Sequence, residues 1–207
     1  MASVLLIHGG LWEDTSGADW FWRRTGVIDG LTERGLTVIA PNRLRRASGW
    51  AAEASHIASS PDLPTGPVTV VGGSFGCAVA VRLALDFPGL VGRLVLAWPA
   101  ALGDQFTAIR LRAGLARQGA PSPVLDALLG TETLPSASDA ELRTLAVPVG
   151  VVASVPPNPL HPRSAVDSLL RVLPSAVELS GSPEAPRPGF AAHRESFVAA
   201  VADFSRA

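Results

Sequence analysis

The sequence predicts an α/β fold of three layers, in which a mostly parallel sheet of about six strands carries helices on both faces. Short apolar runs alternate with segments whose apolar residues recur at helical spacing, and this alternation is typical of a covered parallel sheet. The chain has 207 residues, of which 47% are hydrophobic and 17% charged. This length and composition fit one globular domain with a substantial core, so we expect residues 1–207 to form a single domain.

Six apolar runs predict the strands. The first run ends in His-Gly-Gly, the second is stopped by Pro41, and the third ends in Gly-Gly-Ser-Phe-Gly. The strands are expected at residues 4–7, 36–40, 68–71, 94–97, 149–153 and 176–179.

Helices are expected between these strands. In residues 19–34, Trp20, Val27 and Leu31 recur at helical spacing, and Gly35 follows where a glycine commonly ends a helix. The other helices are expected at residues 47–60, 75–86, 164–173 and 191–204.

A Gly-x-Ser-x-Gly motif occupies residues 72–76, between the third strand and the helix that follows it. A strand that turns at once into a helix through this motif pushes the serine into a strained, exposed position. Glycines are needed because a side chain would clash where the helix and strand pass closely. Ser74 can also be explained as a plain helix N-cap. The earlier strand that ends in His8-Gly9-Gly10 favours a nucleophile instead.

With these two motifs the chain resembles the α/β-hydrolase superfamily from Val4 to about Phe204. The resemblance implies that Ser74 is the nucleophile and that the backbone N–H groups of Gly10 and Phe75 form the oxyanion hole. Two such N–H groups can converge on one developing oxyanion, and each contributes a few kcal/mol in the transition state.

The superfamily usually has two further antiparallel strands before the His-Gly strand, and this chain has no room for them. We therefore expect the α/β-hydrolase fold without its first two strands, in the order 2-1-3-4-5-6. An unprotected first edge could pair with a second copy, so a homodimer is one expectation.

Residues 99–146 interrupt the alternation of strands and helices. Short helices are expected at residues 106–118, 123–129 and 139–145, separated by Pro, Gly and Ser. In the superfamily this position carries the cap over the active site, so we expect a small cap-like insert. The alternative is a peripheral helical connection with no role in the site.

The general base should be a histidine, because a serine hydroxyl is a poor nucleophile until its proton is removed. The superfamily order is serine, acid, then histidine after the last strand. His193 matches that place, and His161, after the fifth strand, is the alternative. His8 is expected to hold loop backbone, and His56 to lie at the surface.

The acid of the triad is missing where the superfamily has it. Residues 153–162, after the fifth strand, contain no carboxylate, and Asn158 occupies the expected place. An amide can fix the histidine tautomer but cannot stabilise the imidazolium charge. The alternatives are a carboxylate from elsewhere, such as Asp104 or Glu184, a slow Ser-His dyad, or chemistry that needs no full triad.

Three residues are candidates for substrate binding. Trp12 and Trp98 belong to aromatic residues at strand-end loops, which suit an apolar pocket. Arg43 opens an arginine-rich loop after the second strand that could attract a carboxylate or phosphate, or could simply pair with Glu53 or Asp62. No metal site and no cofactor are expected, because the sequence has neither ligand-spaced clusters nor a dinucleotide motif.

These features predict a serine hydrolase of an ester, thioester or lactone of a small apolar molecule. The alternatives are a repurposed enzyme that catalyses elimination, cyclisation or C–C cleavage, and a non-catalytic binding protein. The formal net charge of −1 gives no sign of nucleic-acid binding. A single cysteine, Cys77, and the lack of an apolar run of about 18 residues predict a cytoplasmic protein that does not bind membranes.

Overall fold

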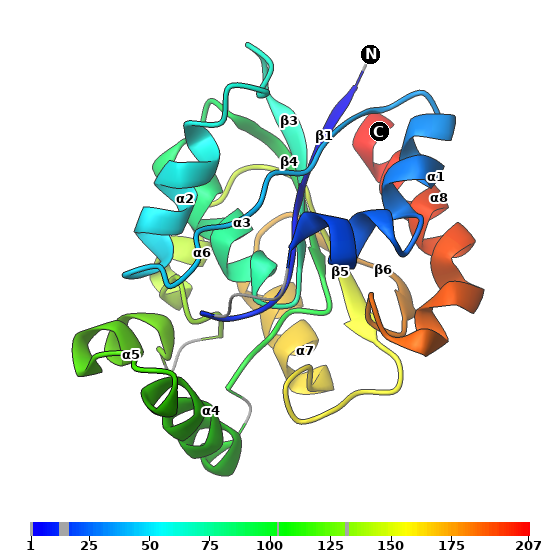
Figure 1. The fold of residues 1–207 in the computed structure, drawn as a ribbon. Coiled ribbons are helices and arrows are strands. Elements are labelled where there is room, and N and C mark those ends of the chain that lie inside the picture. Colours follow the sequence, from blue (N-terminus) through cyan, green and yellow to red (C-terminus); the bar gives the residue numbers. More distant parts are fainter. Residues whose placement is uncertain (1, 13–16, 103, 131–132) are drawn as a thin grey trace.

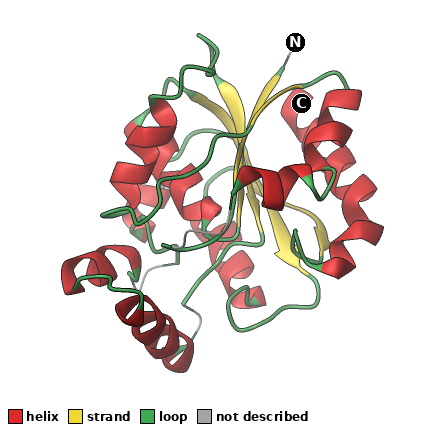
Figure 2. Ribbon diagram, viewed as in Figure 1, coloured by secondary structure: helices red, strands yellow, loops and turns green. Residues whose placement is uncertain are grey.

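The computed structural model describes residues 2–12, 17–102, 104–130 and 133–207. Six strands form one sheet in the order β2-β1-β3-β4-β5-β6, and every neighbouring pair is parallel (Figures 1 and 2). The strands are β1 Ser3–Ile7, β2 Thr37–Ile39, β3 Val68–Gly73, β4 Val91–Ala97, β5 Val149–Ser154 and β6 Ala176–Ser182. The predicted fold class and strand order are confirmed. Pairing of the β2 edge with a second copy stays a prediction.

Side chains of successive strand residues enter the two faces of the sheet alternately. In β1, Leu5 and Ile7 belong to one apolar core cluster, whereas Val4 and Leu6 belong to the other. The first cluster is covered by α2 Trp50–Ala58, α3 Gly76–Asp86 and α7 Arg163–Val172, and the second by α1 Val27–Glu33 and α8 Arg194–Arg206. Figure 2 shows these helices on both sides of the strands. This alternation gives the three layers that the sequence predicts.

Two of the expected helices are divided. Residues 19–34 form a π-helical turn, Asp19–Arg23, and then α1, because Gly26 between them has a φ of 76°. A side chain at Gly26 would be strained by this left-handed conformation. Residues 188–206 likewise form a 3₁₀ helix, Pro188–His193, before α8 begins.

The insert between β4 and β5 holds three short helices, α4 Gln105–Arg117, α5 Ser122–Leu128 and α6 Asp139–Leu142. Leu115, Leu128 and Leu142 are buried and belong to the same core cluster as α2 and α3. Figure 1 shows α4 and α5 projecting from the body of the molecule below the sheet. The insert is thus anchored by leucines, and its role as a cap stays a prediction.

Across the described ranges, no helix combines the length and the apolar character that crossing a membrane requires.

Candidate active site

The turn between β3 and α3 places Ser74 in a strained conformation. Its φ is 54°, in the left-handed region, and its N–H donates to the carbonyl of Ala97 at 2.9 Å. A Cβ atom on Gly76 would lie 2.4 Å from the carbonyl oxygen of Ile7, and one on Gly72 would lie 2.5 Å from that of Gly76. Both flanking glycines of the motif are therefore required by the close approach of α3 to the sheet.

His161 is the histidine that contacts the serine. Its Nε2 lies 2.9 Å from Ser74 Oγ, and the residue is 6% exposed on the loop between β5 and α7. This corrects the expectation for His193, which is exposed at the end of the 3₁₀ helix and accepts a hydrogen bond from Ser196 through its carbonyl. The 3₁₀ helix carries His193 to the surface, so its place after the last strand does not bring it to Ser74.

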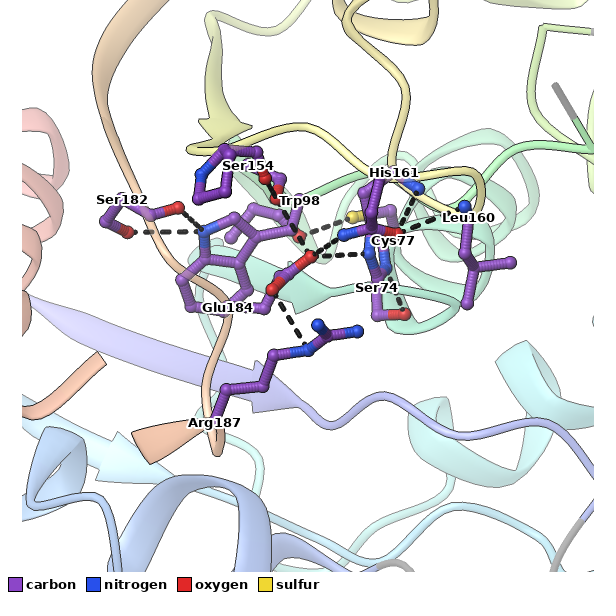
Figure 3. Close-up of polar contacts among 12 residues, drawn as sticks. Ser74, Cys77, Trp98, Ser154, Leu160, His161, Ser182, Glu184 and Arg187 are labelled. Carbon is purple, nitrogen blue, oxygen red and sulfur yellow. Dashed lines mark hydrogen bonds and ion pairs between the residues drawn. The ribbon is translucent and has the colours of Figure 1, made fainter. Parts of the chain in front are cut away.

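Glu184 supplies the carboxylate behind His161 (Figure 3). Its Oε1 lies 2.8 Å from His161 Nδ1, although the ring N–H is not well aligned with it. Alignment of this kind often tightens only when substrate is bound. The same oxygen accepts hydrogen bonds from the Ser154 hydroxyl at 2.8 Å and from the Asn158 amide.

Burial alone would raise the pKa of Glu184, but the close contact with His161 and the hydrogen bond from Ser154 outweigh it and lower the pKa to about 2. Glu184 is therefore ionised at neutral pH although the residue is only 5% exposed. A buried carboxylate beside His161 can stabilise the positive charge that the imidazole acquires when it takes a proton.

Asn158 holds the loop that carries His161. Its side-chain oxygen accepts hydrogen bonds from the backbone N–H groups of Leu160 at 3.1 Å and His161 at 3.2 Å. Its amide donates to Glu184. Asn158 thus orients His161 and Glu184, not His193 as the sequence led us to expect.

Gly10 and Phe75, the expected oxyanion-hole residues, lie at the ends of β1 and β3. Gly10 has a φ of 92°, and Phe75 is the N-cap of α3. Among the described residues, neither backbone N–H has a hydrogen-bond acceptor. Both are thus available to a ligand oxygen, and their role as the oxyanion hole stays a prediction.

Arg43 is buried beneath the Gly10 loop. Its Nε and Nη2 each lie 2.7 Å from a carboxylate oxygen of Glu53, and its Nη1 donates to the carbonyls of His8 at 3.0 Å and Gly10 at 2.8 Å. With four of its five guanidinium N–H groups occupied and the residue 7% exposed, Arg43 is not placed to bind substrate. It holds the loop that carries the Gly10 N–H.

His8 supports the same loop, as expected. Its Nε2 accepts the N–H of Arg43 at 3.1 Å, and its Nδ1 lies 2.7 Å from the carbonyl of Gly9. Burial, reinforced by the nearby Arg43 charge, lowers the pKa of His8 to about 4, so the imidazole is neutral at pH 7.

Neither of the two tryptophans proposed for substrate binding lines the cavity that contains Ser74. Trp98 is fully buried, donates through Nε1 to the carbonyl of Ser182 at 3.0 Å and stacks on Phe197 at a ring-centroid distance of 5.0 Å. It is a core residue. Trp12 donates through Nε1 to the carbonyl of Ala47 at 3.1 Å and lines another cavity, of about 260 Å³, on the Gly10 loop.

Two other side chains that the sequence singled out have structural roles. Asp104, the other carboxylate considered for the triad, caps α4 by accepting from the N–H of Thr107 at 2.8 Å. Cys77 is buried, and burial raises the pKa of its thiol, so it is protonated and unreactive.

A cavity of about 370 Å³ gives access to Ser74, His161 and Glu184. Aromatic and other apolar side chains form most of its wall, with Arg187 as the remaining charged residue: its lining includes Trp20, Phe21, Ala185, Pro186, Arg187 and Pro188. A neighbouring groove of about 690 Å³ runs along α4 and shares Arg187 with it. Within the described part of the chain, no three His, Cys, Asp or Glu side chains are grouped to hold a metal.

The sequence did contain a signal for this arrangement. The loop after the fifth strand has one histidine and no acid, and residues 180–189 contain one carboxylate, Glu184. Together they indicate that the histidine and the acid have exchanged loops. The expected order of serine, acid and then histidine obscured this exchange.

No family model matches the chain, and no curated protein matches it in sequence. Solved structures do match it. A meta-cleavage product hydrolase from Pseudomonas fluorescens superposes with a TM-score of 0.74 at 20% identity, covering 100% of this chain and 91% of the other. A thermophilic esterase from Thermogutta terrifontis gives 0.68 at 18% identity, covering 100% and 90%.

A third match is an alpha/beta hydrolase enzyme from a lagoon-sediment metagenome, with a TM-score of 0.68 at 18% identity, covering 99% of this chain and 90% of the other. Identities this low show a common fold and do not show a common reaction.

Proposed function

The chain has the α/β-hydrolase fold, and we propose that it is a serine hydrolase of small ester, thioester or lactone substrates, with Ser74, His161 and Glu184 as its triad. The observation that carries the proposal is the chain of contacts from Ser74 Oγ to His161 Nε2 at 2.9 Å and from His161 Nδ1 to Glu184 Oε1 at 2.8 Å. A nucleophile within reach of a base that is itself oriented by an acid is the arrangement that activates serine.

In the proposed reaction, Ser74 Oγ attacks the substrate carbonyl while His161 Nε2 accepts its proton. The N–H groups of Gly10 and Phe75 stabilise the oxyanion of the tetrahedral intermediate. His161 then protonates the leaving group, and an acyl enzyme forms on Ser74. Water, deprotonated by His161, releases the acid, and Glu184 stabilises the imidazolium in both halves of the reaction.

The size and lining of the cavity support a small substrate. Its volume of about 370 Å³ lies near the lower end of the range for small-molecule pockets. Trp20 and Phe21 form an apolar wall beside Ser74, so apolar groups flanking the scissile carbonyl can be accommodated there.

The test is covalent labelling with a fluorophosphonate probe, measured by intact mass, together with turnover of p-nitrophenyl butyrate. We expect one adduct on the wild-type protein and none on Ser74→Ala or His161→Ala. His193→Ala should label like the wild type, because its side chain is not near Ser74. No adduct on the wild type, under conditions that saturate a control esterase, would overturn the proposal.

Turnover that survives Ser74→Ala but is lost in His161→Ala would instead indicate chemistry without an acyl enzyme. The same two variants therefore separate a hydrolase from an enzyme that uses the fold for another reaction.

A further inference from the structure

Arg187 stands at the mouth of the catalytic cavity. It lies on the loop after β6, directly before the 3₁₀ helix Pro188–His193. Its side chain lines both the cavity that holds Ser74 and the groove along α4. Figure 3 shows its guanidinium beside Glu184, with the terminal nitrogens on the side of Ser74. Arg187 is thus the cation closest to the nucleophile among the residues that line this cavity.

Only part of the guanidinium of Arg187 is used within the protein. Its Nε lies 3.1 Å from Glu184 Oε2. Neither terminal nitrogen makes a hydrogen bond to any residue that the structure describes, and the side chain is 60% exposed. The two terminal nitrogens are therefore free to bind a ligand while Nε contacts Glu184.

The surroundings favour an anionic ligand. Glu184 also accepts hydrogen bonds from Ser154 and Asn158 and faces His161, so groups other than Arg187 stabilise its ionised form. The other walls of the cavity are apolar. A guanidinium binds planar carboxylates through paired, charge-assisted hydrogen bonds more strongly than it binds neutral groups.

We infer that Arg187 selects substrates that carry a carboxylate near the scissile carbonyl, so that the preferred substrates are half-esters or half-thioesters of short dicarboxylic acids. The inference rests on the proposed hydrolase function and adds the charge of the substrate to it. Ser74 attacks the ester carbonyl, and Arg187 binds the free carboxylate at the other end of the acyl chain.

Arg187 could instead serve only to hold Glu184, and this role makes a different prediction. A positioning role would lower the turnover of charged and neutral substrates by the same factor when Arg187 is replaced. If Arg187 binds the substrate, its replacement lowers the turnover of the charged substrate more than that of the neutral one. The ratio of kcat/KM values for a matched substrate pair therefore separates the two.

The experiment compares the p-nitrophenyl half-esters of glutaric and adipic acid with their methyl p-nitrophenyl diesters, in which a neutral methyl ester replaces the distal carboxylate. The uncatalysed rate is subtracted. The wild type should prefer the half-ester of at least one chain length by about tenfold in kcat/KM, as expected for a charge-assisted pair. Arg187→Gln should abolish the preference, and Arg187→Lys should restore part of it.

Arg171→Gln serves as the charge control. Arg171 lies on α7, is exposed and makes one long contact with Ser168, so its loss should leave the ratio unchanged. Sodium chloride should reduce the preference of the wild type but not that of Arg187→Gln, because salt screens the interaction.

Two failures are distinguishable. If the neutral diesters are hydrolysed at least as fast as the half-esters, or if Arg187→Gln keeps the preference, the inference is wrong while the hydrolase function stands. If no ester is hydrolysed and the fluorophosphonate does not label Ser74, the proposed function is wrong and the inference fails with it.

Discussion

His161 Nδ1 and Glu184 Oε1 lie 2.8 Å apart, although the two residues follow different strands, β5 and β6. These strands are parallel neighbours, so their carboxyl ends meet at one edge of the sheet, about 4.8 Å apart. A histidine and an acid exchanged between the two loops therefore remain in contact. In the order β3-β4-β5-β6, β5 is nearer than β6 to β3, the strand that directly precedes Ser74, so the histidine on the β5 loop is the one that reaches the serine.

The choice between the two histidines predicts contrasting effects on activity. His161→Ala should lower kcat/KM for p-nitrophenyl butyrate by about 10⁴-fold, since the hydroxyl of Ser74 loses its base. His193→Ala should leave kcat/KM unchanged. Equal losses in the two variants, with both proteins folded by circular dichroism, would contradict the assignment of His161.

Glu184 predicts a pH dependence of stability. Its pKa is lowered from 4.5 to about 2 in the folded protein, so it stabilises the fold above pH 4.5 and loses this contribution as the pH falls towards 2. The contribution is at most about 3 kcal/mol. Urea unfolding between pH 6 and pH 2.5 should show a smaller loss of stability in Glu184→Gln than in the wild type.

His8 also lowers the free energy of unfolding as the pH falls, but at higher pH than Glu184, and it serves as an internal reference in that experiment. Its pKa is lowered from 6.5 to about 4, so the unfolded state gains protons first as the pH falls between these values. This part of the curve should be the same in the wild type and in Glu184→Gln. If the curves of the two proteins are parallel below pH 4.5, the low pKa of Glu184 is not correct.

Arg43 predicts a coupled loss of stability and activity. Arg43→Ala leaves Glu53 buried without its partner, which should lower the free energy of unfolding by about 3 to 5 kcal/mol. It also removes the hydrogen bonds to the carbonyls of His8 and Gly10, which hold the loop that carries the Gly10 N–H. We therefore expect kcat to fall in the molecules that remain folded. Arg45→Ala, at an exposed position of the same loop, should change stability by no more than about 0.5 kcal/mol. Equal effects of the two changes, measured by urea unfolding, would show that the buried pair does not stabilise the loop.

Two glycines predict opposite responses to the same substitution. Gly76→Ala forces a Cβ to within 2.4 Å of the Ile7 carbonyl, so the protein should be strongly destabilised and lose activity. Gly114, within α4, has no neighbouring atom within 4 Å of the place that a Cβ would occupy, and Gly114→Ala should raise stability by up to about 1 kcal/mol. Thermal unfolding of both variants checks the pair, and an unchanged melting temperature in Gly76→Ala would contradict the close packing.

The sequence predicted the residues whose role depends on local structure. Ser74 is placed by the Gly-x-Ser-x-Gly turn itself, because the flanking glycines admit α3 against β1 and β3. The order of the six strands follows from the alternation of strands and helices together with the resemblance to a known fold. The prediction succeeded here because each signal lies within a few residues of the feature that it determines.

The sequence could not separate residues whose role depends on the path of a loop. Trp98 and Arg43 both follow strand ends, yet one is packed on Phe197 and the other is paired with Glu53. A strand-end position shows that a side chain is near the site but not in which direction it points.

The sequence by itself determined the parallel six-stranded sheet and the strained serine at its edge, because apolar periodicity and glycine turns act locally. Only the tertiary structure decided that His161 and Glu184, and not His193 and Asn158, stand behind Ser74. The physical reason is that β5 and β6 are parallel neighbours, so the loops that follow them begin side by side. The turn that Asn158 holds directs His161 to Ser74, while the 3₁₀ helix carries His193 to the surface.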